Sequence, residues 1–130
     1  MLVITPGRGL LPADTIVRLA DLRAIARVGV APEEKRYCAP LARDATTLAS
    51  ALASDASVVL LGSIATGKYV DVLQHPLAGR LRFPAEFVGR GDMSRGGLML
   101  RCAKQGQELE YVPLAGAQRH GKRPPRLAPS

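Results

Sequence analysis

The chain contains few of the residues that carry specialised chemistry. Its 130 residues include two cysteines, two histidines, three tyrosines, two phenylalanines and no tryptophan. The cysteines, Cys38 and Cys102, are too few for a disulfide framework and lack the spacing of metal ligands. Aromatic residues are not interleaved with basic ones, as they are in modules that bind single-stranded nucleic acids. The sequence therefore predicts no metal site and indicates no particular cofactor.

Long apolar segments are also missing. No run approaches the roughly 20 residues that a membrane-spanning helix needs, and no charged leader precedes a long apolar stretch near the start. We therefore expect no membrane partner and a cytoplasmic location. The composition, 47% hydrophobic and 22% charged, is typical of a soluble globular protein. The length predicts one domain over residues 1–117, followed by a basic, Pro/Gly-rich tail over residues 118–130.

The positive charge is large and unevenly distributed. Lys and Arg number 18 against 11 Asp and Glu, a net charge of +7. Residues 118–130 carry +4 and residues 80–104 another +4, whereas residues 31–79 carry −1. Arginine outnumbers lysine 14 to 4, and arginine forms planar two-point contacts with phosphate and carboxylate. The bias is compatible with anion binding, although an Ala- and Arg-rich genome would produce it as well.

Apolar spacing predicts two helices in the first half of the chain. Residues 14–28 repeat an apolar residue every third position, with Asp14 as the expected N-cap and Gly29 as the expected stop. A second amphipathic helix is expected from Pro40 to about residue 54, because proline suits the first helical turn. Residues 1–5 predict a short strand.

The second half alternates expected strands with expected helices. Residues 58–61 form a continuous apolar run, which predicts a strand buried on both faces in the middle of a parallel sheet. A short helix is expected after it, ending before Pro76, and residues 81–83 and 109–112 are strand candidates. Residues 98–105 fit either a hairpin arm or a helix, and their good helix formers, followed by Gly106, favour the helix.

This order predicts an α/β fold, a small three-layer domain with a mainly parallel sheet of about four strands. Ligands of such sheets bind outside the carboxyl ends of the strands. Two glycine-rich segments follow strand candidates at such ends, so both are candidate ligand sites.

The first segment, GSIATGK over residues 62–68, matches the phosphate-loop pattern G-x-x-x-x-G-K. In that pattern backbone amides and a helix N-terminus surround the phosphates, and the lysine reaches the outer ones. The residue after the lysine is Tyr69, where a magnesium-binding Ser or Thr is expected, and no other strand candidate ends in the acidic residue that would complete the metal site. The segment thus predicts anion binding without nucleotide-hydrolase machinery, or only a tight turn. Its candidate contacts are Gly62, Ser63, Thr66, Gly67 and Lys68.

The second segment, GRGDMSRGG over residues 89–97, combines four glycines with two arginines. Glycines let a backbone approach a ligand closely, and paired arginines clamp anions. Asp92 and Glu86 are weak candidates for a base or a sugar contact, and Asp92 alternatively caps a helix that starts there. The candidate ligand contacts are Arg90, Gly91, Ser94 and Arg95.

These observations favour binding of a phosphorylated small molecule, such as a nucleotide or nucleoside derivative, where the two segments meet at the sheet edge. The side chains of these two segments are compatible with transfer or hydrolysis chemistry, but no nucleophile is identifiable. Whether the protein is an enzyme therefore stays open. One alternative is a nucleic-acid-binding module that uses the Arg-rich surface and the basic tail. Another is a structural or regulatory subunit whose glycines serve only backbone geometry. The sequence leaves the oligomeric state open.

Overall fold

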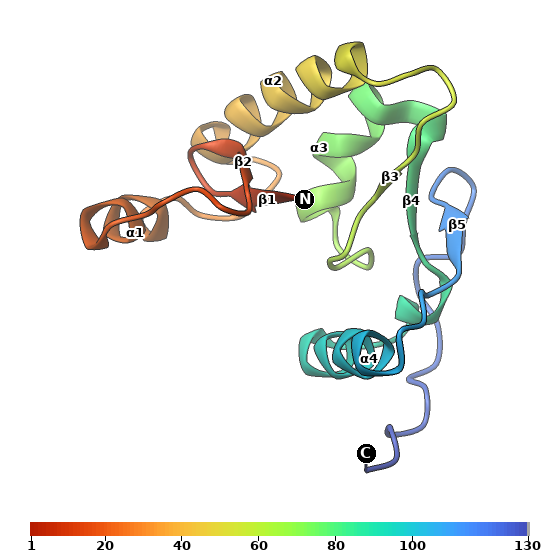
Figure 1. Cartoon of the computed structure of the whole chain (residues 1–130). Coiled ribbons are helices and arrows are strands. Elements are labelled where there is room, and N and C mark those ends of the chain that lie inside the picture. The colour runs from red at the N-terminus through yellow and green to blue at the C-terminus, as the bar shows by residue number, and fades with distance from the viewer. Residues whose placement is uncertain (130) are drawn as a thin grey trace. The chain divides into compact units, whose positions relative to one another are not determined.

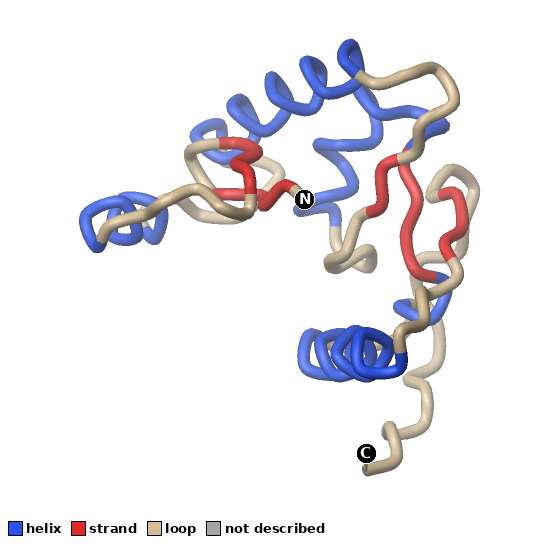
Figure 2. Tube along the Cα trace, in the orientation of Figure 1, coloured by secondary structure: helices blue, strands red, loops and turns tan. Residues whose placement is uncertain are grey.

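The computed structural model describes residues 1–129 and divides the chain into two compact units. The first unit contains Met1–Ala56 and Gly67–Ala78, and the second contains Ser57–Thr66 and the chain from Gly79 onward. The described part holds four α-helices and two small sheets, so the α/β class is confirmed (Figures 1 and 2). No helix within these residues is long and apolar enough to cross a membrane.

The first unit begins with a β-hairpin of which the sequence analysis identified only one arm. Strands β1 (Leu2–Thr5) and β2 (Gly9–Pro12) pair antiparallel. The amide of Arg8 donates to the carbonyl of Thr5 at 2.9 Å, which closes a four-residue turn. Pro6 and Gly7 hold its two central positions, and Gly7 has φ of +83°, as a type II turn requires.

Helix α1 (Leu19–Ala26) is shorter than the predicted helix over residues 14–28. It starts late because the Asp21 carboxylate accepts a hydrogen bond from the backbone amide of Arg18 at 2.8 Å, which fixes the first turn there. The residues before it, including the expected cap Asp14, are exposed. The helix ends at the C-cap Arg27, before the expected stop at Gly29.

Helix α2 (Lys35–Ala51) starts upstream of the predicted position, and Pro40 lies inside it. The Glu34 side chain caps the helix by accepting from the amide of Arg36 at 3.1 Å, so the start does not depend on the proline. Helix α3 (Gly67–Leu77) likewise continues through Pro76, which was expected to stop it. Since Pro76 lies in the last turn, it removes only one helical hydrogen bond.

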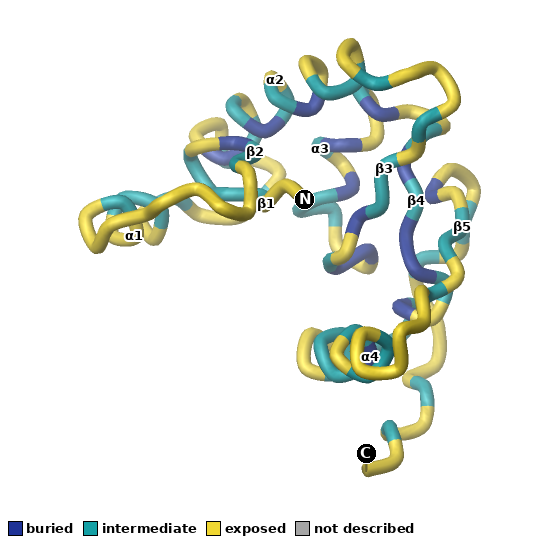
Figure 3. Tube along the Cα trace, in the orientation of Figure 1, coloured by how far each residue is buried: buried dark blue, intermediate teal, exposed yellow. Residues whose placement is uncertain are grey.

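The core of the first unit lies where α2 faces α3 (Figure 3). The two helices contribute the buried side chains Tyr37, Leu41, Ala45, Val70, Leu73 and Leu77. The Tyr37 hydroxyl donates to the backbone carbonyl of Lys68 at 2.5 Å and thereby ties α2 to the first turn of α3. Burial raises the pKa of this phenol, which keeps it protonated as a donor.

The second unit contains a three-stranded sheet in the order β3-β4-β5. Strand β3 (Val58–Val59) pairs parallel with β4 (Leu81–Pro84), and β5 (Tyr111–Pro113) pairs antiparallel with β4. The predicted mainly parallel sheet of about four strands is therefore wrong in detail. The strand at residues 1–5 pairs locally in the hairpin instead, and the segment after α4 returns antiparallel.

The position of the strands also differs from the prediction. Strand β3 lies at an edge of this sheet, and its two valines are only half-buried, although the apolar run predicted a central strand. Strand β4 takes the central place, with Leu81, Phe83 and Pro84 buried. The strand candidate at residues 81–83 thus forms the central strand of this sheet.

Helix α4 (Asp92–Gln105) confirms the helical interpretation of residues 98–105. It begins inside the second glycine-rich segment, with Gly91 as its N-cap, and ends at the left-handed Gly106 as expected. Short 3-10 turns, Ala78–Arg80 and Ala85–Phe87, flank β4.

Substitution of Tyr37 by Phe tests the contact between α2 and α3. The variant keeps the buried ring but loses the bond to the Lys68 carbonyl, so we expect the free energy of unfolding to fall by about 1 kcal/mol. Urea unfolding followed by circular dichroism measures the change. Tyr69→Phe is the matched control, for which we expect no comparable loss, and equal stabilities of all three proteins would contradict the assignment.

Candidate functional site

The first glycine-rich segment is divided between the two units. Gly62, Ser63 and Thr66 belong to the second unit, whereas Gly67 and Lys68 open helix α3 in the first. The side chain of Ser63 is largely buried, and Thr66 is exposed. Helix α3 begins at Gly67, the second glycine of the pattern, as the phosphate-loop pattern predicts.

The side chains at the start of α3 contact one another. The Asp71 carboxylate lies so close to Gly67 that a Cβ atom there would be 2.0 Å from Oδ2. The Nζ atom of Lys68 lies 5.2 Å from the centre of the Tyr69 ring, a cation–π contact. A carboxylate thus lies beside Gly67 in the first turn of α3, and the lysine is directed to a tyrosine.

The second segment, together with Glu86 before it, forms a compact hydrogen-bonded network. Arg90 donates through Nε to the carbonyl of Glu86 at 2.7 Å and through a terminal nitrogen to the Ser94 hydroxyl at 3.0 Å. Arg95 donates to the carbonyl of Arg90 at 2.7 Å and forms an ion pair with Asp92. The side chain of Arg95 is only 11% exposed. Both arginines therefore order the segment that was expected to clamp a ligand.

The weak candidates for a catalytic base are not positioned as a pair. Asp92 is the first residue of α4 and is held by Arg95, while the exposed Glu86 contributes its backbone carbonyl to the network. A single anion site that combines Lys68 with Arg95 stays a prediction, because the two residues belong to different units.

The basic tail contacts the second segment at Gly89. This glycine has φ of +76°, and a Cβ atom there would lie 2.3 Å from the carbonyl oxygen of Lys122. A Cβ atom on Gly121 would lie 2.9 Å from the side chain of Val88. Two glycines thus allow the two backbones to approach each other, which the sequence analysis did not anticipate because the two segments are far apart in the chain.

From there the tail follows helix α4. Leu127 lies 3.6 Å from the Cβ position of Gly97, and the Arg101 guanidinium donates to the carbonyl of Ala128. Beyond Gly89, the tail therefore contacts α4 at two further positions, Gly97 and Arg101.

The contacts between the tail and α4 bring the basic residues of both segments into one region of the second unit. Lys122, Arg123 and Arg126 are exposed on the tail, and Arg119 is half-buried. Helix α4 adds Arg101 and the exposed Lys104, and Arg90 lies just before it. We call the surface made by these residues the tail–α4 surface.

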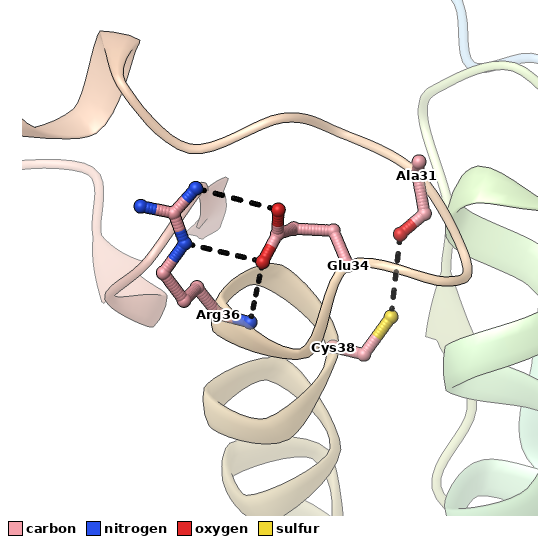
Figure 4. A network of polar contacts seen from close by, with 4 residues as sticks. All are labelled: Ala31, Glu34, Arg36 and Cys38. Atoms are coloured by element: carbon pink, nitrogen blue, oxygen red, sulfur yellow. Dashed lines mark hydrogen bonds and ion pairs between the residues drawn. The ribbon is translucent and has the colours of Figure 1, made fainter.

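The remaining polar clusters are local. Glu34 pairs with Arg36 at the start of α2, and the Cys38 thiol lies within hydrogen-bond distance of the Ala31 carbonyl (Figure 4). The same thiol lies 3.1 Å from the carbonyl of Pro32. Burial raises the pKa of this thiol, which disfavours the reactive thiolate. In residues 1–129, no three His, Cys, Asp or Glu side chains gather as metal ligands. The Glu34 cluster caps the start of α2.

Comparison with known proteins adds no further evidence. The chain matches no protein-family model, no curated protein and no solved structure. Its function is therefore argued from its own residues.

Substitution of Gly89 by Ala tests the contact between the tail and the second segment. The new methyl group meets the Lys122 carbonyl and requires an unfavourable backbone conformation, so we expect the tail to leave α4. Brief trypsin digestion, followed by mass spectrometry, then cuts after Lys122 and Arg126 several times faster than in the unmodified chain.

Gly91→Ala is the matched control, because a Cβ atom at Gly91 has no neighbour within 4 Å in the described chain and its φ is negative. Its digestion rate is expected to match the unmodified chain. Equal rates for Gly89→Ala and Gly91→Ala would show that the tail is not held at Gly89.

Proposed function

We propose that the second unit binds the phosphate backbone of double-stranded nucleic acid through the tail–α4 surface. The observation that carries the proposal is the separation of charge between the units. The second unit has ten Lys and Arg against four Asp and Glu, a net charge of +6, whereas the first has eight against seven, a net charge of +1. Backbone phosphates are the abundant polyanion that such a surface attracts.

The acidic residues of the second unit do little to neutralise this surface. Asp92 is paired with Arg95, and Glu86 lies before α4. Glu108 and Glu110 follow the end of α4 and precede or adjoin β5. The exposed bases of the tail, Lys122, Arg123 and Arg126, have no acidic neighbour in the sequence and form no ion pair within the described residues.

The contact at Gly89 supports binding by an ordered surface. A free basic tail would lose conformational entropy when it bound nucleic acid. Contacts to Gly89, Gly97 and Arg101 already hold this tail along α4. Less entropy is then lost on binding, so the same number of bases binds more tightly.

The aromatic residues favour a duplex over a single strand. Phe83 and Phe87 are buried, and Tyr111 is half-buried in β5. Burial also raises the pKa of Tyr111, as does Glu108. Single-strand binding uses exposed aromatic rings on which bases stack, and these rings are not fully exposed. A duplex offers denser phosphate charge and requires only Lys and Arg.

Binding of a phosphorylated small molecule is the second candidate. It is supported by the start of α3 at Gly67, directly before Lys68, as in a phosphate-binding turn. The engaged arginines of the second segment and the Asp71 carboxylate beside Gly67 weigh against it.

The double variant Lys122→Ala/Arg123→Ala tests duplex binding. The slope of log affinity against log salt is negative, and two lost phosphate contacts reduce its magnitude by about two. At about 0.1 M salt this corresponds to a loss of affinity of roughly ten- to a hundred-fold. Fluorescence anisotropy with a labelled duplex, measured over a salt series and with two unrelated sequences, gives both quantities.

Arg23→Ala/Arg27→Ala is the matched control, since it removes the same charge from exposed positions of α1 in the first unit. We expect its affinity to stay within about twofold of the unmodified chain, because long-range charge effects are screened at this salt. Equal losses in both variants would indicate nonspecific attraction by net charge and would overturn the assignment.

Thermal stability in the presence of nucleotides separates the two candidate functions. Stabilisation by one nucleotide over its nucleoside, lost in Lys68→Ala but kept in Lys122→Ala/Arg123→Ala, would favour the small-molecule site. No response to duplex or nucleotide would favour a structural or regulatory role.

A further inference from the structure

The apolar face of helix α1 is uncovered in the first unit. Leu19 and Leu22 are 61% and 51% exposed, and Ile16, just before the helix, is 88% exposed. None of the eight residues of α1 is buried in the described chain. Helices α2 and α3, by contrast, bury three residues each in the core they share.

One ion pair and one apolar contact link the α1 segment to the hairpin. Arg8, beside the hairpin turn, pairs with Asp21 at 2.9 Å, and Val28 contacts Gly7. The backbone amide of Arg18 and the Arg8 guanidinium hold the pKa of the Asp21 carboxyl below its usual range. These contacts orient the helix but bury little apolar surface.

A helix of this length gains little stability by itself. Isolated helices shorter than about 12–15 residues are marginal in water, and most helices in proteins are stabilised by packing an apolar face. Leu19 and Leu22 of α1 form such a face without packing, whereas Ala24 and Ile25 on another side of the helix are half-buried. A second surface that covers Leu19 and Leu22 would supply the missing stabilisation.

The charges beside this face define the chemistry of that surface. Arg23 follows Leu19 by four residues and Arg27 follows Arg23 by four, so both lie along one side of the apolar face. No ion pair involves Arg18, Arg23 or Arg27 within residues 1–129. The only acid of α1, Asp21, is already paired with Arg8.

We propose that Ile16, Leu19, Leu22 and Arg23 form a docking surface for an acidic amphipathic helix of a partner protein. Leucine side chains of the partner cover the apolar face, and its carboxylates pair with the arginines beside it. Charge disfavours a second copy of this chain, because the same face on two copies would set arginines against arginines. The surface belongs to the first unit, so the proposal is independent of duplex binding.

A synthetic peptide tests the proposal with the whole chain. The probe is a labelled 16-residue peptide with leucines at helical spacing of three and four and glutamates on the other face. The comparison peptide carries lysine in place of every glutamate. We expect anisotropy to report binding of the glutamate peptide at least tenfold tighter than of the lysine peptide. Hydrogen exchange of residues 19–26 is expected to slow in the complex.

Variants then locate the binding surface. Leu19→Ser/Leu22→Ser is expected to weaken peptide binding at least tenfold, and Arg23→Glu to weaken it severalfold, with duplex binding unchanged in both. These side chains are exposed, so the variants keep the circular dichroism spectrum of the folded chain. Leu100→Ser is the matched control, because Leu100 is a 73% exposed leucine on α4 of the second unit.

Three results would overturn the proposal. Equal binding of the two peptides, or no anisotropy change at the highest soluble peptide concentration, would exclude an acidic helix. A dimer in light scattering that Leu19→Ser/Leu22→Ser dissociates would assign the face to a second copy. Slow hydrogen exchange of residues 19–26 in the chain alone would show that α1 needs no partner.

Discussion

The close approach of the Lys122 carbonyl to Gly89 is the contact on which the proposed binding surface depends. It requires a residue without a side chain at position 89 and a backbone with φ of +76°, and both conditions are met by glycine. The contact holds the tail at the start of α4, and the Arg101 bond to Ala128 holds it farther along. Without these contacts the tail bases would be a solvated terminal segment, and the surface would not be a defined site.

The hydrogen-bond network around Arg90 and Arg95 also helps to hold the tail in place. Hydrogen bonds to backbone carbonyls and to Ser94, with the ion pair to Asp92, order the segment that carries Gly89. The arginines first expected to bind a ligand thus build the support for the tail. The proposed anion binding then rests on the exposed bases of the tail and of α4, and the largely buried Arg95 has a positioning role.

Local signals predicted several elements correctly. The helix formers before Gly106 predicted the end of α4, and the apolar spacing predicted a helix around Leu41 and Ala45. The turn signal Pro6-Gly7 between two apolar runs indicates a hairpin, although only its first strand, over residues 1–5, was predicted. The sequence left the strand order open, because the order depends on pairing partners distant in the chain. The central place expected for residues 58–61 is taken by β4 instead. The contact of Gly89 with Lys122 was unpredictable for the same reason, since neither glycine-rich segment indicates what packs against it.

The central claim is that the tail–α4 surface of the second unit binds duplex nucleic acid. Hydrogen exchange of the whole chain, measured with and without a short duplex, tests it most directly because it maps the contact without any substitution. The account predicts slower exchange in residues 88–104 and 118–127, and unchanged exchange in α2 and α3. Protection confined to α2 and α3, or a uniform response along the chain, would contradict it.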